Sequence, residues 1–402
     1  MRLSRLLSRC ARLDNRLRLG FVTIHAAQDQ SAYSGTAFAM RQALREHSDV
    51  ELFDIDRLSI PLYPLWRAKQ AAYWFGTGRR YWMNRQPAVL RGLSKQVAEK
   101  AAAIGRLDCL ISPSSIPLTA YRGPEPTVFW TDATFESLDD FYPEATGFCV
   151  ETRRAGNAQE RAALDGCRLA IYSSQWAMNS AIKSYGADRT KLAVVPYGAN
   201  AMTVPSSDEI PALVAGRCSG PLRLLFVGVH WERKGGPLAI AVAEEMSRRG
   251  ISVAIDLVGA TPASRLPSFA ASHGFLSKDR EAARAQLDGL FRRADVLILP
   301  TRADCVPMVI AEACAYGLPT VATSVGGVGT VVEDGTTGRL MSAAAGAEAW
   351  ADAVLQLTDD REAYAAASHA ARRLYDRSLN WPTAVQTVVR LLRECIEHSH
   401  AA

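Results

Sequence analysis

One strand–loop–helix–strand pattern constrains the fold of this sequence more than any other feature. The apolar run Val296–Leu299 predicts a short buried strand. After a loop, Met308–Tyr316 predicts a helix, which Gly317 caps and Pro319 prevents from continuing. A second strand is expected at Pro319–Thr323. Strand, helix and strand in this order form the βαβ unit of a parallel sheet, so we predict an α/β fold.

The loop and the start of this helix form a candidate ligand site. Ligands of parallel sheets bind beyond the carboxyl ends of the strands, and the free N–H groups of a helix start favour anions. Two carboxylates, Asp304 and Glu312, flank this helix start. A ligand with a phosphate at one point and hydroxyl groups at others, such as a nucleotide sugar, would suit this site. The alternative is an ordinary buried βαβ unit with a surface acid pair.

A second candidate site follows the predicted strand Leu222–Val229. The residues after it, His230–Gly236, have the sequence HWERKGG and precede a predicted helix that ends near Arg249. Two cations, Arg233 and Lys234, would oppose the dipole at a helix start unless an anion is bound there. Backbone amides and fixed positive charge together predict a phosphate site.

These two segments resemble the donor-binding motifs of retaining GT-B glycosyltransferases of the large family-4 type, the glycosyl transferases group 1. Asp304 and Glu312 match the two acids of the family's Glu-x7-Glu signature, although the first is Asp here. The resemblance implies that Asp304 orients the donor sugar and that Glu312 binds the ribose. Pro307 stands where the family usually has Gly, and the family's amide contacts would map to Met308 and Val309.

The resemblance extends to the basic segment. The family pattern Gly-Arg-x4-Lys-Gly runs here from Gly228 to Lys234, and it implies that Lys234 binds the diphosphate. Val229 stands at the position of the family Arg, so we expect Arg233 to supply the missing charge. Phe275 belongs to a short segment that resembles the one whose backbone meets the nucleotide base in the family.

Two positions in the first half are candidates through the same resemblance. Gly35 lies in Ser34-Gly35-Thr36, which resembles the family's first glycine-containing loop, although a plain helix N-cap explains it equally well. Asp132 follows the predicted strand Thr127–Trp130, near which many family members have a His. The resemblance implies an acceptor-side or sugar-orienting role for Asp132, and a loop N-cap is the alternative.

Aromatic and basic residues alternate between Tyr63 and Trp82. If exposed, this stretch would suit an acceptor sugar or a lipid headgroup. If buried, it is the packing of a helix on the first sheet. Single-stranded nucleic acid is a third reading, which the overall charge disfavours.

The resemblance covers about residues 17–395 and implies a GT-B architecture. In this architecture, two Rossmann-like domains face each other across a cleft, and a C-terminal helix crosses back to the first domain. The expected parts are a basic arm (1–18), an acceptor-side domain (19–200), a linker (201–220), a donor domain (221–375) and a closing helix with its tail (376–402).

The net charge of +5 comes from the N-terminal arm. The first 18 residues hold six Arg against Asp14, and the other 40 basic residues balance the other 40 acidic ones. A neutral body argues against nucleic acid as a partner.

The N-terminal arm lacks the apolar core of a secretory signal. An Arg-rich helix touching a membrane or addressing an organelle is one reading, and a frayed tail or a wrongly assigned start is the other.

The eight cysteines form no CxxC pair and no cluster with His, so we expect reduced thiols, a cytoplasmic protein and no metal site. No apolar run reaches 18 residues, so no spanning helix is expected.

Together with the resemblance, these observations predict a metal-independent, retaining, hexosyltransferase-type enzyme. It would move a sugar from a nucleoside diphosphate sugar, with no further cofactor, to a glycan, a lipid-linked glycan or a small molecule, as in polysaccharide biosynthesis. We expect it in the cytoplasm, with the arm as a candidate peripheral contact at the inner face of the membrane. A nucleotide-sugar-binding scaffold with little catalysis is the alternative. An oxidoreductase or epimerase is disfavoured, because no Gly-x-Gly-x-x-Gly follows the first strand of either half.

Overall fold

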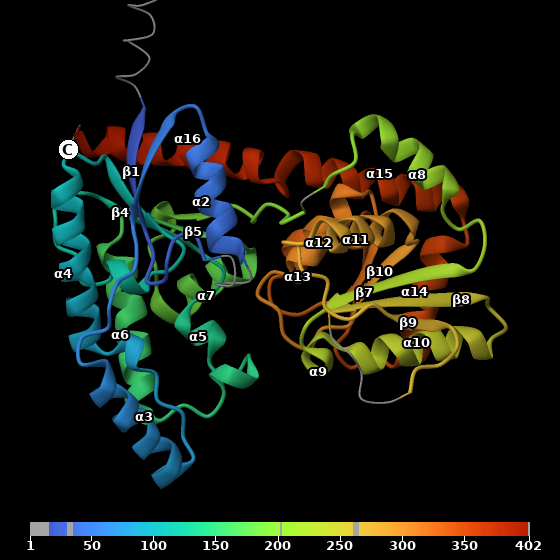
Figure 1. The fold of residues 1–402 in the computed structure, drawn as a ribbon, viewed down its shortest axis with the longest axis horizontal. Helices are drawn as coiled ribbons and strands as arrows, with labels where there is room; N and C mark the ends of the chain where they lie inside the picture. The colour runs from blue at the N-terminus through green and yellow to red at the C-terminus, as the bar shows by residue number, and fades with distance from the viewer. Residues whose placement is uncertain (1–15, 30–34, 202, 260–264, 401–402) are drawn as a thin grey trace, which may run out of the picture. The chain divides into compact units, whose positions relative to one another are not determined.

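The computed structural model describes residues 16–29, 35–201, 203–259 and 265–400 of the chain (Figure 1). The chain forms two compact units. The first contains Met1–Val195 together with Ala384–Ala402, and the second contains Pro196–Thr383. Each unit is built on one six-stranded parallel sheet.

The sheet of the first unit has the strand order β2-β1-β3-β4-β5-β6. Its strands are short and largely apolar, and β3, β4 and β5 are buried along their whole length. In chain order they are β1 (Leu17–Val22), β2 (Val50–Ile55), β3 (Cys109–Ser112), β4 (Thr127–Thr131), β5 (Leu169–Tyr172) and β6 (Leu192–Val194). The helices are α2 (Thr36–Glu46), α3 (Tyr63–Thr77), α4 (Pro87–Ile104), α5 (Phe135–Leu138), α6 (Val150–Gly166) and α7 (Gln175–Tyr185).

The sheet of the second unit has the order β12-β11-β10-β7-β8-β9. Its strands are β7 (Leu222–Gly228), β8 (Val253–Gly259), β9 (Ala270–Ser272), β10 (Val296–Leu299), β11 (Thr320–Thr323) and β12 (Gly338–Met341). Its helices are α8 (Ile210–Gly216), α9 (Trp231–Lys234), α10 (Gly236–Arg248), α11 (Glu281–Arg293), α12 (Met308–Ala315), α13 (Val328–Val331), α14 (Ala347–Thr358) and α15 (Arg361–Ser378). Helix α10 packs against α14, and α12 packs against α15.

Apolar burial explains why these segments fold where the sequence predicts them. Leu224, Phe226 and Ile298 on the central strands are fully buried in one cluster with Val242 of α10 and Ile310 of α12. The parallel sheets and the alternation of strand and helix confirm the predicted α/β, Rossmann-like fold of both halves. The βαβ pattern at residues 296–323 is confirmed as β10, α12 and β11.

Two details differ from the sequence prediction. The predicted helix that ends near Arg249 is α10, but an additional turn of helix, α9, precedes it; Gly235, whose φ of 81° places it in the left-handed region, separates the two. Residues 201–220, expected to be an irregular linker, contain α8. Ile210 and Val214, four residues apart, bury one side of α8 together with Tyr364. The linker prediction missed this short helix because Pro, Ser and Gly around it masked its one apolar pair.

The last helix, α16 (Trp381–His400), begins in the second unit and continues in the first. At its start, Trp381 donates its ring N–H to Asn200 Oδ1 at 3.0 Å. Further along, Val385, Val388 and Leu392 are fully buried, and Arg393 pairs with Asp49 at 2.9 Å. The predicted closing helix is therefore present and belongs to both compact units. Among the described residues, no helix combines the length and the apolar character that crossing a membrane requires.

Candidate functional site

The strand order of the second unit locates its candidate site. Strand β7 comes first in the chain and has β8 on one side and β10 on the other. The connections from β7 and β10 therefore diverge at the carboxyl ends of these two strands. In open α/β sheets this divergence is where ligands bind. The residues that follow Gly228 and Leu299, the last residues of β7 and β10, form the candidate site.

An ion pair joins the two connections at this point. Lys234 Nζ, at the end of α9, donates to Asp304 Oδ2 in the loop after β10. The side chains of Lys234 and Asp304 are only 14% and 7% exposed. Two charges this deeply buried are tolerated because each satisfies the other, and removing one partner leaves an expensive isolated charge. The pair holds a cation at a fixed position beside the end of the sheet.

Two glycines make room for this arrangement. A Cβ on Gly228 would lie 2.9 Å from Lys234 Cβ and Cγ, so the lysine stem runs directly over the end of β7. A Cβ on Gly235 would lie 1.9 Å from the carbonyl oxygen of Pro300. Gly235 therefore lets α9 and α10 approach the end of β10 closely, which brings Lys234 to Asp304.

Arg233 ties α9 to the same loop. Its Nη1 donates to the carbonyl oxygen of Ala303 at 2.7 Å, and its own carbonyl accepts from the N–H of Arg302 at 2.8 Å. Arg233 and Lys234 directly precede Gly235, the N-cap of α10, so they lie at a helix start as expected. They are also the last two residues of α9, which is a single turn of helix.

Glu312 is held by a different lysine. It lies on α12, a helix of which seven of the eight residues are buried. Its Oε1 accepts from Lys278 Nζ, and the same ammonium donates to the carbonyl oxygen of Asn200 at 3.0 Å. The Glu312 side chain is 6% exposed. A carboxylate on so apolar a helix requires a counter-charge, and Lys278 supplies it.

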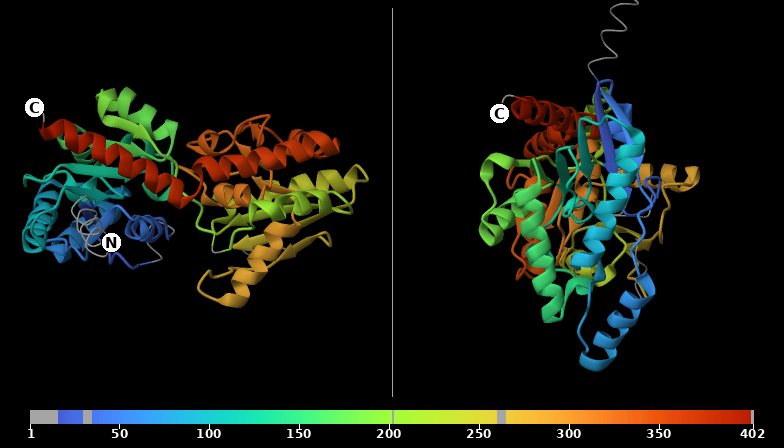
Figure 2. Two further views of the ribbon diagram at one scale, coloured as in Figure 1. Left: turned by 90° about the horizontal axis from the view of Figure 1, so that it is seen from above. Right: turned by 90° about the vertical axis from the view of Figure 1, so that its left-hand side faces the viewer.

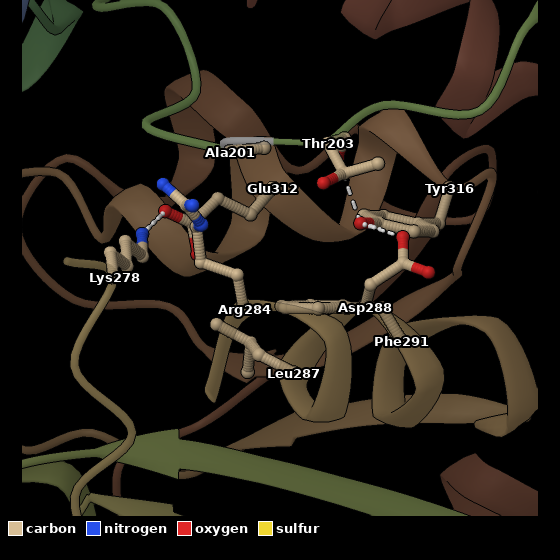
Figure 3. A pocket seen from close by; sticks show the side chains of 9 residues that line it. All are labelled: Ala201, Thr203, Lys278, Arg284, Leu287, Asp288, Phe291, Glu312 and Tyr316. Atoms are coloured by element: carbon tan, nitrogen blue, oxygen red, sulfur yellow. Dashed lines mark hydrogen bonds and ion pairs between the residues drawn. The ribbon is translucent and has the colours of Figure 1, made fainter. Parts of the chain in front are cut away.

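A small cavity lies beside Glu312 (Figure 3). Its volume is about 20 Å³, close to the room that one water molecule needs. Lys278, Arg284, Asp288 and Tyr316 line it, and Tyr316 donates to Thr203 or Asp288, each at 2.8 Å. The remaining lining residues are Ala201, Thr203, Leu287, Phe291 and Glu312. Lys234 and Asp304 are not among them, so Asp304 and Glu312 do not share this cavity.

Other predicted site residues take the following positions. Met308 and Val309 are the first two residues of α12, so their N–H groups have no acceptor within the helix. Phe275 follows Gly274, which has a φ of 60°, and its side chain is 71% exposed. In the first unit, Gly35 is the N-cap of α2 with a φ of 79°, and Asp132 directly follows β4.

Within the residues that the structure describes, no group of three or more His, Cys, Asp or Glu side chains is arranged to hold a metal ion.

Comparison with known proteins identifies the second unit. Residues 221–360 match the family model described as glycosyl transferases group 1. These residues form a glycosyl transferases group 1 domain. All the donor-motif residues of the second unit, from Gly228 to Glu312, lie within the matched range, and the predicted resemblance is confirmed there.

Relatives and solved structures agree with this assignment. The D-inositol 3-phosphate glycosyltransferase of Paenarthrobacter aurescens is 26% identical over 260 residues, which are 61% of this chain and 62% of that protein. The chain spans about half the length of the curated relatives that it matches.

Two structures with the same fold cover nearly the whole chain. Sucrose-phosphate synthase from Thermosynechococcus elongatus has a TM-score of 0.68 at 14% identity, covering 95% of this chain and 100% of that one. Anabaena Alr3699/HepE, solved with UDP-glucose, has a TM-score of 0.59 at 17% identity, covering 94% and 100%. At these identities the two structures support the GT-B fold alone.

The group 1 motifs did not reveal every residue at the site. Lys278 lies 34 residues before Glu312 and belongs to no predicted motif. In the sequence, Lys278 is recognisable only as a cation that follows the short segment Gly274–Leu276. The role of Gly235 also depends on contact with Pro300, 65 residues later, which spacing alone does not indicate.

Proposed function

We propose that this chain is a retaining glycosyltransferase that moves a sugar from a nucleoside diphosphate sugar to a hydroxyl group of an acceptor. The observation that carries the proposal is the buried Lys234–Asp304 pair at the diverging ends of β7 and β10 in a group 1 domain. A fixed cation at this edge suits a leaving group that gains negative charge during the reaction.

Lys234 would bind the donor diphosphate and stabilise it as it leaves. The bond between the anomeric carbon and the phosphate oxygen breaks, and the charge that develops on the diphosphate meets the Lys234 ammonium and the free N–H groups of Met308 and Val309. Because Asp304 already holds the ammonium in place, little reorganisation is required when charge develops. Arg233, fixed to Ala303, adds positive charge nearby. Asp304 would orient the donor sugar through its second oxygen.

Glu312 would bind the ribose hydroxyl groups, and this requires a local change. The Glu312 side chain is 6% exposed and its Oε1 already accepts from Lys278, so the carboxylate is not free for a ribose as it stands. We expect the ribose hydroxyls to replace the Lys278 ammonium on Glu312. Phe275 and its neighbours in the loop before Lys278 would then lie near the base.

The donor is proposed to be a uridine diphosphate hexose. One structural neighbour was solved with UDP-glucose, and a relative is a D-inositol 3-phosphate glycosyltransferase. Gly35 and Asp132 are proposed to act on the acceptor side, from the first unit. The acceptor is a glycan, a lipid-linked glycan or a small molecule, the reaction needs no metal, and the protein acts in the cytoplasm.

Ligand-dependent thermal unfolding tests the donor site. A ligand that binds only the folded state raises the apparent melting temperature. We expect UDP and UDP-glucose to raise it in the wild-type chain and to raise it less in Lys234→Ala. Release of UDP in the presence of candidate acceptors, with the anomeric configuration of the product read by NMR, tests transfer and retention. Binding without transfer to any acceptor would favour a nucleotide-sugar-binding scaffold instead.

A further inference from the structure

Helix α3 exposes an unusual amount of apolar surface. Of the eight large hydrophobic side chains that are exposed among the described residues, five lie between Leu62 and Phe75. Phe75 is 86% exposed, Leu62 67% and Leu65 64%. Both Figure 1 and the right-hand view of Figure 2 show α3, in blue, at the periphery of the first unit. A contiguous exposed apolar patch on a folded protein marks a surface that something else covers.

Helix α3 carries apolar side chains on its outward side as well as on the side that packs against the protein, unlike an ordinary surface helix. The side facing the protein carries Lys69 and Tyr73, which bind the two oxygens of Glu151 at 2.5 and 2.7 Å. The opposite side, at helical spacing, has one charged residue, Arg67. The other exposed residues there are Pro64, Ala68, Ala71, Ala72, Trp74 and Phe75, while Leu65, also exposed, lies one turn before Lys69 at the start of the helix. A surface helix normally turns its apolar side inward and its charged side to water.

The contacts with the rest of the unit hold this orientation in place. The ring of Tyr73 stacks on that of Tyr81 at 5.2 Å, and Trp66 donates its ring N–H to the carbonyl oxygen of Pro61 at 2.9 Å. Together with the Glu151 contacts, these interactions keep the apolar side outward. Rotating α3 to bury that side would break all of them.

The residue that begins α3 adds to the argument. Leu62 has a φ of 55°, in the left-handed region that a branched side chain adopts only at a cost. Its side chain is 67% exposed, so burial within the chain recovers little of that cost. A partner that covers Leu62 would recover it.

The charge around α3 indicates which partner. No acidic residue lies between Asp56 and Glu99. The same stretch contains eight basic residues: Arg57, Arg67, Lys69, Arg79, Arg80, Arg85, Arg91 and Lys95. Apolar and aromatic side chains flanked by cations are typical of helices that lie in the surface of an anionic bilayer.

Two occupants from the chain itself are disfavoured by charge. Residues 1–15 contain four Arg and one Asp, so they would bring more positive charge to a basic region. A second copy of α3 would place cations opposite cations.

We infer that α3 is a membrane-contact helix that docks this chain on anionic lipid. Leu65 and Phe75 reach the boundary of the acyl chains, and Trp74 lies at the level of the headgroups, where indole rings prefer to be. Arg67, Arg79 and Arg80 meet the lipid phosphates. This inference concerns the first unit and does not depend on the proposed sugar transfer.

Vesicle flotation of the full chain tests this inference. The wild type is mixed with vesicles of pure phosphatidylcholine or of phosphatidylcholine with one-quarter phosphatidylglycerol. We expect it to float with the anionic vesicles only, and less so at high salt. Leu65→Ser/Phe75→Ser should reduce the binding at least tenfold with an unchanged melting temperature, since both side chains face water. Arg79→Gln/Arg80→Gln should reduce it at least fivefold and weaken its dependence on salt.

Val229→Ser, which changes an apolar side chain 55% exposed in the second unit, is the matched control and should float like the wild type. Equal flotation of the wild type and Leu65→Ser/Phe75→Ser would overturn the inference and assign the binding to another segment, such as the Arg-rich arm. A dimer in sedimentation velocity that is lost in Leu65→Ser/Phe75→Ser, without flotation, would overturn it in favour of a second copy of the chain.

Discussion

At the scale of single residues, Lys234 and Asp304 are coupled in both stability and proposed activity. Replacing Lys234 by Ala leaves Asp304 as a buried, unpaired carboxylate, and such a loss costs about 3–5 kcal/mol of unfolding free energy. Lys234→Ala/Asp304→Asn removes the isolated charge and should recover most of that stability. In both variants we expect turnover to be lower than in the wild type by about 10²-fold or more.

Denaturant unfolding and UDP release on the same preparations separate the two effects. Asp304→Asn alone serves as the control that retains the lysine. Turnover of the double variant close to that of the wild type would remove Lys234 from the proposed mechanism.

Glu312 and Lys278 give a second prediction at this scale. Glu312→Gln keeps the shape of the side chain but loses charge-assisted hydrogen bonds to ribose. A loss of about 1.5–3 kcal/mol corresponds to roughly 10- to 100-fold weaker UDP binding by calorimetry.

Lys278→Met is the matched change on the other partner. It should lower the melting temperature of the free protein, because Glu312 loses its counter-charge, and should increase the stabilisation by UDP, because no ammonium has to be displaced. An unchanged response to UDP would show that Lys278 does not compete with the ligand.

The sequence predicted residues of this site unequally, for a physical reason. Lys234, Asp304 and Glu312 stand at short, regular distances from strand ends and helix starts, where local patterns carry information. Their partners are set by contacts across the unit. The Asp304–Lys234 contact spans 70 residues and the Glu312–Lys278 contact spans 34, so the division of the two acids between two lysines did not follow from the sequence.

At the scale of elements, Gly235 is the residue on which the α9–α10 connection depends. In Gly235→Ala, the added methyl group would clash with the carbonyl oxygen of Pro300. The alanine would also have to adopt the φ of 81° that Gly235 has. Left-handed strain and overpacking each cost about 1–3 kcal/mol, so we expect a loss of several kcal/mol of stability, or a displaced α9 and weaker UDP binding. Urea unfolding and calorimetry measure the two outcomes.

Gly289→Ala is the control for this prediction. Gly289 lies within α11, and a Cβ there would meet nothing within 4 Å. Alanine favours helix over glycine by about 1 kcal/mol, so this variant should be slightly more stable than the wild type. Equal effects of the two substitutions would contradict the close approach assigned to Gly235.

Helices and strands were predictable where the apolar pattern was strong, and less predictable where it covered only a few residues. Strands such as β7 and β10 follow from their apolar runs. The break between α9 and α10 and the helix α8 depend on single residues packed against distant parts of the same unit, Pro300 and Tyr364.

At the scale of the whole molecule, Cys167, Cys218 and Cys314 should resist modification. Burial raises the pKa of Cys167, of Cys218 and of Cys314 from 9.0 to about 12 in each case. The thiolate is the reactive form, so labelling by a maleimide at pH 8 should be slow in the folded protein and fast in urea. Mass spectrometry of peptides identifies each site. Cys305 and Cys314 adjoin the donor site, and UDP should slow their labelling further.

The same shifts predict how stability depends on alkaline pH. The unfolded chain loses these protons near pH 9 and the folded chain near pH 12, so the folded state binds more protons between those values. Stability should therefore be fully present below about pH 9 and fall as the pH rises toward 12. A melting temperature that stays constant over this window would contradict the assigned burial.

The shared helix α16 has a consequence for how the chain comes off the ribosome. Residues 196–383 are synthesised before residues 384–400, whose Val385, Val388 and Leu392 complete the hydrophobic interior of the earlier unit. During synthesis, the unit encoded second can finish folding while the unit encoded first still waits for its final segment. A chain truncated after Asn380 and released from the ribosome should then contain a protease-resistant late portion and a protease-sensitive early one, the reverse of the usual N-to-C order.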